Sequence, residues 1–329
     1  MMREYRSSKR QPNTRRRNVA AAMIAGGALA FLYYSFEPVA AEDNRPVNIA
    51  SVDKTDLTGL PDSVIQSQIE PKLVPNPGET ESVANSTSSK ATELTNRYAL
   101  LYMVSQLERG IEKLKEHDCY SVTFERLERI EGVLHDQQEI DLKVRHAPFS
   151  VYMKWRSGDK GRQLLFTEKE NDGRMLVKLG GLKGRFLPTI KLDPKGSRAM
   201  AESRHSVAQA GIVNLARELI LNRQKDLKLK QMPSCVITEN VKFHKRPCTQ
   251  VVVEYRSATD SPVYRRTITM IDEKLHIPVY VRNYTWPSEE TVDVEEETLI
   301  ECYCFKDLHL NEQLADVTWK KSNPRYRFR

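Results

Sequence analysis

The chain has 329 residues, of which 40% are hydrophobic and 29% are charged, and its formal net charge at pH 7 is +7. Seven basic and two acidic residues lie within the first 41 positions, so the rest of the chain carries a net charge of only +2. This charge gives no support for nucleic-acid binding, which needs a strongly basic surface, and we expect no nucleic-acid partner.

Residues 1–41 are typical of a targeting segment. A basic stretch, an apolar run over residues 19–36 and small residues ending at Ala41 follow one another. Cleavage after Ala41 would make Glu42 the first residue of the mature protein. The alternative is an uncleaved anchor, because a run of 18 residues is close to the shortest helix that spans a bilayer. Both interpretations place the rest of the chain in the periplasm or cell envelope, and the second attaches it to the inner membrane.

Residues 42–92 are predicted to form a flexible linker, because they contain five prolines and no aromatic side chain. The folded domain is predicted over residues 93–329. It begins with an amphipathic helix from about Leu94 to Glu116, where apolar residues recur at helical spacing. A strand over residues 120–130 follows, and the Glu131–Leu134 segment is expected to turn the chain.

The stretch from Glu139 to Thr167 predicts the centre of a sheet. Apolar and polar residues alternate over residues 140–145 and again over 149–156, as they do in strands with one wetted face. Pro148 separates these strands, and a turn over 157–161 leads to a third strand. Such short connections predict an antiparallel meander. The sequence Asn171-Asp172-Gly173 then predicts a hairpin before a strand over 174–179.

The second half of the domain has a similar pattern. The glycine-rich segment 180–185 lacks the ending of a phosphate-binding loop and is predicted to be the exit from an edge strand. An irregular connection over 187–206 and a helix over 207–222 are expected next. Further strands are predicted near residues 235–243, 249–255, 264–271, 278–284 and 298–308. The fold class is therefore α+β, with about ten antiparallel strands in a curled half-barrel and helices packed on its concave face.

The polar residues do not form a recognisable catalytic or metal-binding motif. The seven histidines are scattered, no nucleophile, base and orienting group can be assembled, and we predict no cofactor, no metal and no enzymatic activity. Arg204 and His205 follow Ser203, but adjacent residues rarely form a triad. We expect them to anchor the connection over the sheet, with His205 bonded to backbone.

The five cysteines are expected to act as buried apolar side chains. In an exported chain an odd number permits at most two disulfides and one free thiol. Two of them, Cys302 and Cys304, would lie on one face of a strand and could not easily bond each other. Simple hairpin register would not place Cys235 opposite Cys248, and the connectivity, including Cys119, stays open.

The run from Ile140 to Arg145 and the run from Pro148 to Trp155 resemble an uncharacterised family of exported bacterial domains. Other segments that fit are Asn171-Asp172-Gly173, Gly180-Gly181, Leu192-Asp193-Pro194, Ser203-Arg204-His205, Arg246-Pro247-Cys248, Tyr284-Thr285-Trp286-Pro287 and Asn323-Pro324-Arg325-Tyr326-Arg327-Phe328. That family is similar in layout to the outer-membrane lipoprotein carriers of the LolA/LolB group, in which a curled sheet under helices holds acyl chains. The resemblance implies a LolA-like fold and supplies no catalytic residues.

One face of the predicted sheet is a candidate binding surface. Its apolar residues are Phe149, Val151, Met153, Trp155, Leu164, Phe166, Met175 and Val177. If this face is open, we expect a non-catalytic envelope protein that binds lipid or the acyl chains of a lipoprotein. If the two helices seal it, the face is an ordinary core, and we expect an envelope scaffold that binds other envelope proteins. A hydrolase acting on envelope polymers is a third hypothesis, which no motif supports.

Overall fold

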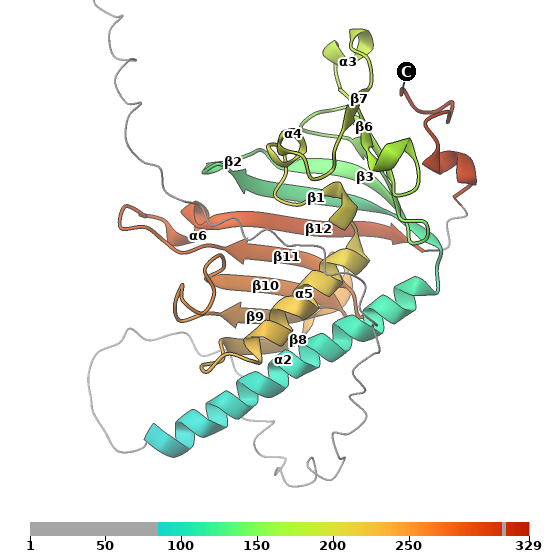
Figure 1. Ribbon diagram of the computed structural model, residues 1–329. Coiled ribbons are helices and arrows are strands. Elements are labelled where there is room, and N and C mark those ends of the chain that lie inside the picture. Colours follow the sequence, from blue (N-terminus) through green and yellow to red (C-terminus); the bar gives the residue numbers. More distant parts are fainter. Residues whose placement is uncertain (1–84, 311–313, 329) are drawn as a thin grey trace, which may run out of the picture. The chain divides into compact units, whose positions relative to one another are not determined.

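The computed structural model describes residues 85–310 and 314–328 (Figure 1). The predicted targeting segment, the cleavage site at Ala41 and Glu42, and most of the predicted linker lie outside these residues. Among the helices of the described ranges, none combines the length and the apolar character needed to cross a bilayer.

The described residues contain one antiparallel sheet of twelve strands. Eleven of them lie side by side in the order β7-β6-β5-β4-β3-β1-β12-β11-β10-β9-β8, and β2 pairs with β1. The bounds are β1 Cys119–Ile130, β2 Val133–Leu134, β3 Gln138–Arg145, β4 Ser150–Trp155, β5 Gln163–Thr167, β6 Met175–Lys178, β7 Ile190–Leu192, β8 Ser234–Phe243, β9 Arg246–Glu254, β10 Arg266–Asp272, β11 Pro278–Tyr284 and β12 Leu299–His309. The first half of the sheet, which we call a half-sheet, runs in chain order from β1 through β3 to β7 at one edge. The chain then crosses to the opposite edge, and β8 to β12 form the second half-sheet, whose last strand, β12, pairs with β1.

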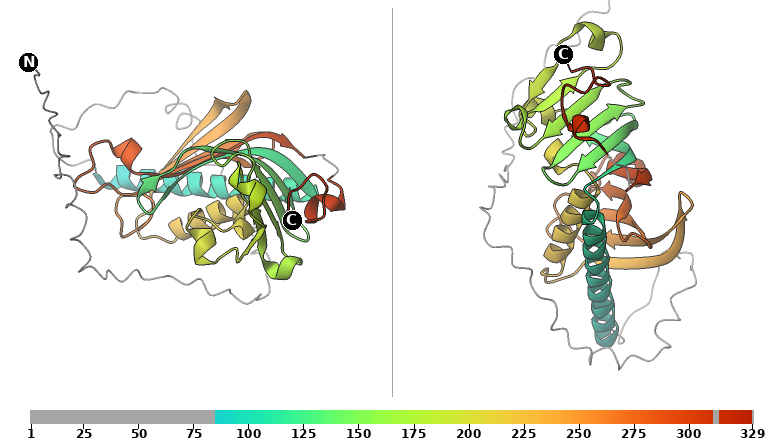
Figure 2. Two further views of the ribbon diagram at one scale, coloured as in Figure 1. Left: turned by 90° about the horizontal axis from the view of Figure 1, so that it is seen from above. Right: turned by 90° about the vertical axis from the view of Figure 1, so that its right-hand side faces the viewer.

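The helices are mostly short, apart from two. The bounds are α2 Asn85–Lys115, α3 Lys183–Phe186, α4 Ser197–Met200, α5 Ile212–Asp226 and α6 Val294–Glu297, with 3-10 turns η2 Asn171–Gly173, η3 Val207–Gln209 and η4 Asp316–Trp319. The long helices α2 and α5 lie against each other on the concave face of the sheet (Figures 1 and 2). The predicted fold class, a curled antiparallel sheet with helices on its concave face, is confirmed.

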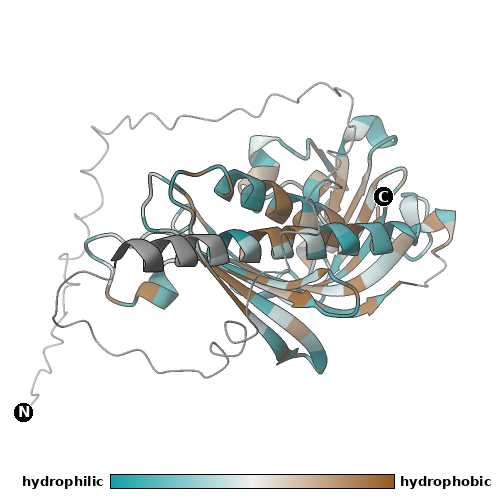
Figure 3. Cartoon of the chain, turned by 90° about the horizontal axis from the view of Figure 1, so that it is seen from below, coloured by the Kyte–Doolittle hydropathy of each residue, from teal (hydrophilic) through white to brown (hydrophobic). Residues whose placement is uncertain are grey.

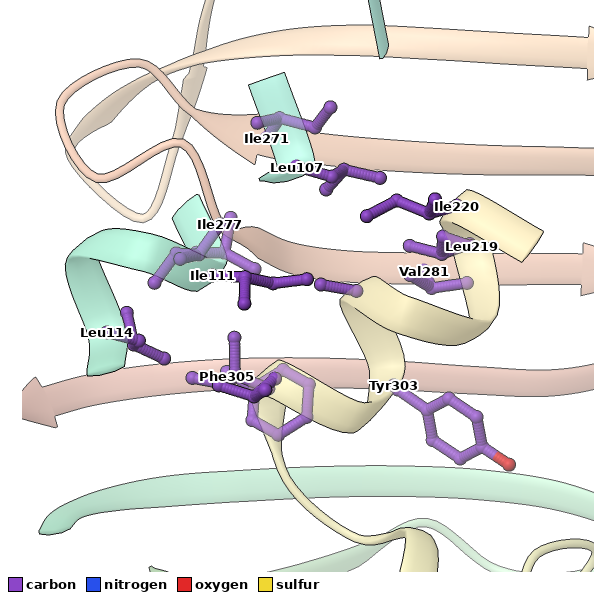
Figure 4. Packing of buried hydrophobic residues seen from close by; sticks show 14 of the residues in the cluster. Leu107, Ile111, Leu114, Leu219, Ile220, Ile271, Ile277, Val281, Tyr303 and Phe305 are labelled. Carbon is purple, nitrogen blue, oxygen red and sulfur yellow. The ribbon is translucent and has the colours of Figure 1, made fainter. Parts of the chain in front are cut away.

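The main core lies between these two helices and the sheet. Apolar and polar positions alternate along the strands (Figure 3), so each strand turns one apolar row toward the helices. Leu107 and Ile111 of α2 meet Ile220 of α5 above Ile271 and Val281 of the sheet (Figure 4). Each such side chain contributes about 1.5–3 kcal/mol when fully buried, so this layer holds α2 and α5 in place.

A second, smaller core lies on the opposite face of β4–β6. The C-terminal segment 314–328 crosses these strands (Figure 2, right) and buries Trp319 and Phe328 against Leu165 and Leu176. The ring of Tyr326 stacks on Tyr152 at a centroid distance of 4.0 Å. Both faces of this half-sheet are therefore covered, which explains why every side chain of β5 and β6 is buried.

Several sequence predictions need correction. The sheet has two more strands than the ten expected, because β2 and β7 are too short to give a clear alternating pattern. Segment 180–185 does lead out of a strand, β6, as predicted, but β6 has β7 as its neighbour and is not the edge strand that was expected. The connection 187–206 is less irregular than predicted, since it contains β7 and α4. Helix α2 begins at Asn85, inside the predicted linker, because residues 85–93 contain no proline that would stop a helix.

The second helix also differs from the prediction. It is broken into η3 and α5 at Gly211, whose φ of 99° favours glycine. A Cβ on Gly211 would lie 2.7 Å from the Tyr120 hydroxyl, which itself accepts a hydrogen bond of 2.8 Å from the Ile212 N–H. The close approach to Tyr120 therefore sets where α5 begins.

The described cysteines are all free thiols, four of them buried and Cys302 half-buried. In the β8–β9 hairpin Cys235 lies opposite Val253 and Cys248 lies opposite Val241. The Cys235 and Cys248 thiols are therefore not cross-strand neighbours, and this agrees with the predicted register.

Candidate functional site

A cavity of about 320 Å³ lies against the concave face of the sheet. Strands β1, β4, β5, β6, β11 and β12 supply one wall, and α5 with the segment 192–211 supplies the other. No described residue of α2 lines it. Small-molecule sites in proteins commonly have volumes of about 300–1,000 Å³. The helices thus seal the β8–β10 side of the concave face but leave a cavity of ligand-binding size on the other side.

The predicted binding face forms much of the apolar wall of this cavity. Four of its residues line the cavity: Met153, Trp155, Leu164 and Met175. Three others are buried in the same core cluster, outside the lining: Val151, Phe166 and Val177. Phe149 lines a smaller neighbouring cavity of about 200 Å³. The sequence therefore places the right row of side chains on the concave face, and their role in binding stays a prediction.

Trp155 is held firmly at the edge of the cavity. Its indole Nε1 donates a hydrogen bond of 2.9 Å to the side-chain oxygen of Gln138. The guanidinium of Arg162 lies 4.9 Å from the ring centroid, and that of Arg126 lies 5.9 Å away, within reach of a cation–π contact. These contacts fix the ring, so that it presents a rigid apolar surface.

The other end of the cavity is polar and is centred on Glu301 of β12. The side chain of Glu301 is only 2% exposed. Its Oε2 accepts hydrogen bonds from Arg204 Nε at 2.9 Å and lies 3.0 Å from His205 Nε2. Its Oε1 accepts from the Tyr264 hydroxyl at 3.0 Å and from Asn283 Nδ2 at 2.7 Å. A buried carboxylate with this many donors is an ionised acceptor.

A second buried carboxylate, Glu128 of β1, lies beside the first. The Tyr303 hydroxyl is 2.7 Å from Glu128 Oε1 and 3.3 Å from Glu301 Oε2, so it bridges the two. The guanidinium of Arg126 is 3.4 Å from Glu128 Oε2 and also donates to Ser203 Oγ at 3.0 Å. We call these residues, Glu128, Glu301, Asn283, Tyr264, Tyr303, Arg204 and His205, the polar cluster.

The structure places Arg204 and His205 where the segment 192–211 meets the sheet. Both contact Glu301, and Arg204 also donates to the Arg129 carbonyl at 3.3 Å. The partner of the His205 ring is thus a carboxylate, and the expected bond to backbone is wrong. Ser203 Oγ donates to the carbonyl of His205, not to its ring, so these three residues do not form a triad.

The polar cluster shifts the pKa values of its members. Burial alone would raise the pKa of Glu301, but the hydrogen bond and charge of His205 and the charge of Arg204 hold it well below its usual range. Burial alone would lower the pKa of His205, but its bond to Glu301 and the charge of Glu128 raise it. Burial and the charge of Glu301 raise the pKa of Tyr264 and of Tyr303, so both hydroxyls keep their protons and act as donors.

The raised pKa of His205 predicts a loss of stability on the alkaline side. In the folded protein His205 binds its proton more tightly than in the unfolded chain, so its contribution is complete below about pH 6.5 and disappears as the pH rises through the folded-state pKa. His146 and His276 have lowered pKa values, so they destabilise the folded protein as the pH falls below about 6.5, not as it rises. We expect the urea midpoint of the wild type to fall above pH 6.5 and that of His205→Gln to fall less. Parallel curves for the two proteins would contradict this.

Sequence reasoning missed the carboxylates, the amide and the tyrosines of the polar cluster. The alternating pattern of β12 could have indicated Glu301, because residues 301, 303 and 305 are two positions apart and lie on the same inward face of the strand. A carboxylate at an inward position of an otherwise apolar strand must be paired with donors. The sequence does not show which donors, because they come from Tyr264 ahead of β10, from β11 and from the segment 192–211.

The cavity brings apolar side chains and buried polar groups together. The residues that the structure describes contain no group of three His, Cys, Asp or Glu side chains placed to hold a metal ion. The guanidinium of Arg204 lies against Glu301 and takes up the position that a cation would need. What the cavity offers is an apolar wall with a fixed aromatic ring and a set of hydrogen-bonding groups, with Arg126 in contact with both Trp155 and Glu128.

Sequence comparison identifies the family. A model of the protein family of unknown function DUF1571 matches residues 117–328. The chain belongs to the DUF1571 family. The matched segment of this DUF1571 protein contains all twelve strands and every lining residue of the cavity. The expectation of an uncharacterised family is confirmed, and no significant match is found among curated proteins.

Solved structures of low sequence identity resemble the DUF1571 chain. The lipoprotein LppX from Mycobacterium tuberculosis is 12% identical, with 65% of this chain and 97% of that chain covered and a TM-score of 0.38. A LolA superfamily protein from Nitrosomonas europaea is 10% identical, with coverages of 66% and 96% and a TM-score of 0.29. A DUF1329 family protein from Desulfovibrio piger is 10% identical, with coverages of 70% and 98% and a TM-score of 0.31. Similarity this weak carries no information on ligands or partners.

Proposed function

We propose that this DUF1571 protein is a non-catalytic binding protein of the cell envelope that holds an acyl chain or a similar lipid-like group in the cavity. The observation that carries the proposal is the cavity of about 320 Å³, which the helices leave against the apolar row of the sheet. A protein that needed this row only for stability would fill the space with side chains, because protein interiors are close-packed.

The lining supports an elongated apolar ligand. Met153, Leu164 and Met175 face the cavity from three neighbouring strands, and Leu215 and Leu219 face it from α5. Methionine and leucine side chains adapt to flexible apolar chains, and Met in particular fills irregular space. Two of the lining guanidiniums, those of Arg126 and Arg162, are bound to carboxylates, and that of Arg217 donates to the side-chain oxygen of Asn214.

A scaffold role with a sealed core is the alternative, and one observation favours it. Over β8–β10, α2 and α5 cover the concave face of the sheet with buried apolar side chains, as a sealed core requires. The part of the concave face that lines the cavity is not covered in this way. Export through residues 1–41, as a cleaved signal or as an anchor, completes the proposal and places the cavity outside the cytoplasm, where envelope lipids, lipoproteins and other envelope proteins are the available partners.

Filling the cavity should abolish retention of a lipid ligand. Ala199 is half-buried in α4 and lines the cavity, so Ala199→Phe introduces a ring into the space that an acyl chain would use. Native mass spectrometry after gentle purification should show co-purifying phospholipid or acyl species on the wild type and at least a several-fold smaller fraction on the variant.

Ala201→Phe is the matched control. Ala201 is the exposed C-cap residue of α4 and does not line the cavity, so the same change there should leave lipid retention unaltered. Wild-type protein that repeatedly carries no lipid, together with identical spectra for the two variants, would contradict the proposed function and favour the scaffold.

A further inference from the structure

The connection between β6 and β7 carries apolar side chains that are exposed to solvent. We call residues 179–188 the tip loop, because Figure 1 shows α3, which they contain, at the far end of the first half-sheet, away from α2 and α5. The exposed fraction is 73% for Leu182, 86% for Phe186 and 44% for Leu187. None of the three lines the cavity, so ligand binding there does not account for them.

Backbone contacts hold both ends of the tip loop. The Gly181 N–H donates a hydrogen bond of 3.1 Å to the Lys160 carbonyl, and a Cβ on Gly180 would lie 2.5 Å from the same oxygen, so this approach requires glycine. At the other end, the ammonium of Lys178 donates to the carbonyl of Leu187. The loop is therefore tied to the sheet while its apolar side chains stay in water, which is unfavourable unless a partner covers them.

The tip loop lies in a strongly basic part of the chain. Residues 179–198 contain five basic residues and one acidic residue, a net charge of +4, whereas the whole chain after residue 41 has a net charge of +2. Two of the five, Lys183 and Arg185, belong to the loop itself. The other three are exposed: Lys191, Lys195 and Arg198. Near an anionic bilayer each basic residue strengthens association by about fivefold.

A bilayer fits this loop better than a protein partner does. Stable protein interfaces bury about 1,200–2,000 Å² in total, which a short loop at the tip of a sheet is too small to supply. Lipid head groups, in contrast, rearrange around a projecting side chain. Apolar residues beside Lys and Arg are typical of segments that lie in the head-group region. The combination of exposed apolar and basic residues therefore indicates an anionic lipid surface.

A second exposed connection of the chain has the opposite charge. Val292, between β11 and β12, is 91% exposed. Residues 287–298 contain six acidic residues and no basic one, so an anionic surface would repel this connection. Val292 therefore provides a control for apolar exposure alone.

We infer that the tip loop docks on an anionic lipid bilayer. Leu182 and Phe186 enter the head-group region, and the charges of Lys183 and Arg185 attract the bilayer. The inference goes beyond the proposed function and does not depend on it, because none of these residues lines the cavity. The loop and the cavity are neighbours, since β6 and β7, which flank the loop, each supply a lining residue. Docking would thus bring the cavity next to the membrane surface.

A local fluorescence reporter tests the docking. Phe186→Trp and Val292→Trp each place a tryptophan at an exposed position of the full-length protein. Each protein would be mixed with vesicles of phosphatidylcholine and phosphatidylglycerol that carry brominated acyl chains. Bromine quenches tryptophan only at short range, so subtraction of the wild-type signal leaves the quenching of the added residue. We expect clear added quenching for Phe186→Trp and none for Val292→Trp.

The lipid charge is tested with the same reporter. On vesicles of phosphatidylcholine alone, the added quenching of Phe186→Trp should be at least severalfold smaller. Replacing both basic residues of the loop in this protein, as Lys183→Gln and Arg185→Gln, should also reduce it on the anionic vesicles. The N-terminal segment and any lipid in the cavity that quenches Trp155 act on wild type and variants alike, so the subtraction removes their contribution.

Three results would overturn the inference. They are equal added quenching at positions 186 and 292, equal added quenching on the two kinds of vesicle, and no added quenching at position 186; the last would favour a protein partner for the tip loop. Lipid retention by the wild type in native mass spectra decides the proposed function separately, because that measurement does not involve the tip loop.

Discussion

Glu301→Ala is expected to lower the free energy of unfolding by about 3 kcal/mol. The change removes an ionised acceptor that is 2% exposed and leaves Arg204, His205 and the Tyr264 hydroxyl without their partner. Breaking a buried pair by removing one side costs about 3–5 kcal/mol. The lower end applies here because the Arg204 and His205 side chains are 26% and 40% exposed, so water can partly replace the carboxylate.

Urea denaturation monitored by circular dichroism would measure this loss, with Glu295→Ala as the control. Glu295 also meets two guanidiniums, those of Arg265 and Arg266, each at 3.3 Å, but its side chain is 51% exposed. Exposed pairs contribute about 0–1 kcal/mol, so this variant should stay close to the wild type. Equal effects of the two substitutions would mean that the polar cluster does not hold the segment 192–211 on the sheet.

The general architecture could be predicted because it depends on local patterns. Alternation over 140–145 and 149–156 fixes which side chains of β3 and β4 share a face, and the register of the β3–β4 pair places Val144 opposite Val151 as a short connection requires. The same rule put Met153 and Trp155 on the concave face. Period-two alternation and connection length are sufficient for such statements, since both are properties of neighbouring residues.

The parts that could not be predicted depend on residues far apart in the chain. The start of α5 is set by the hydroxyl of Tyr120, which lies 92 positions before Ile212. The burial of Glu301 is possible only because Arg204 and His205 arrive from a segment about a hundred residues earlier. The sequence marks Gly211 and Glu301 as unusual for their surroundings, but it does not identify the partners that make each of them stable.

Two buried tryptophans, one on each face of the β4–β6 strands, allow effects on stability to be separated from effects on ligand binding. Trp155 lies on the concave face at 3% exposure and lines the cavity, whereas Trp319 lies on the convex face at 1% exposure. Truncating a buried aromatic residue costs about 3–5 kcal/mol through lost burial and the space left behind. Trp155→Ala and Trp319→Ala should therefore lower the free energy of unfolding by similar amounts.

Their effects on ligand retention should differ. Trp155→Ala removes the fixed ring that Gln138 and Arg162 hold at the edge of the cavity, so co-purifying lipid should decrease in native mass spectra recorded well below the unfolding temperature. Trp319→Ala loosens the C-terminal segment on the other side of the sheet and should leave the retained lipid fraction near that of the wild type. If both variants lose stability and both keep their lipid, Trp155 belongs to a sealed core, and the apolar row of β4–β6 serves the fold alone.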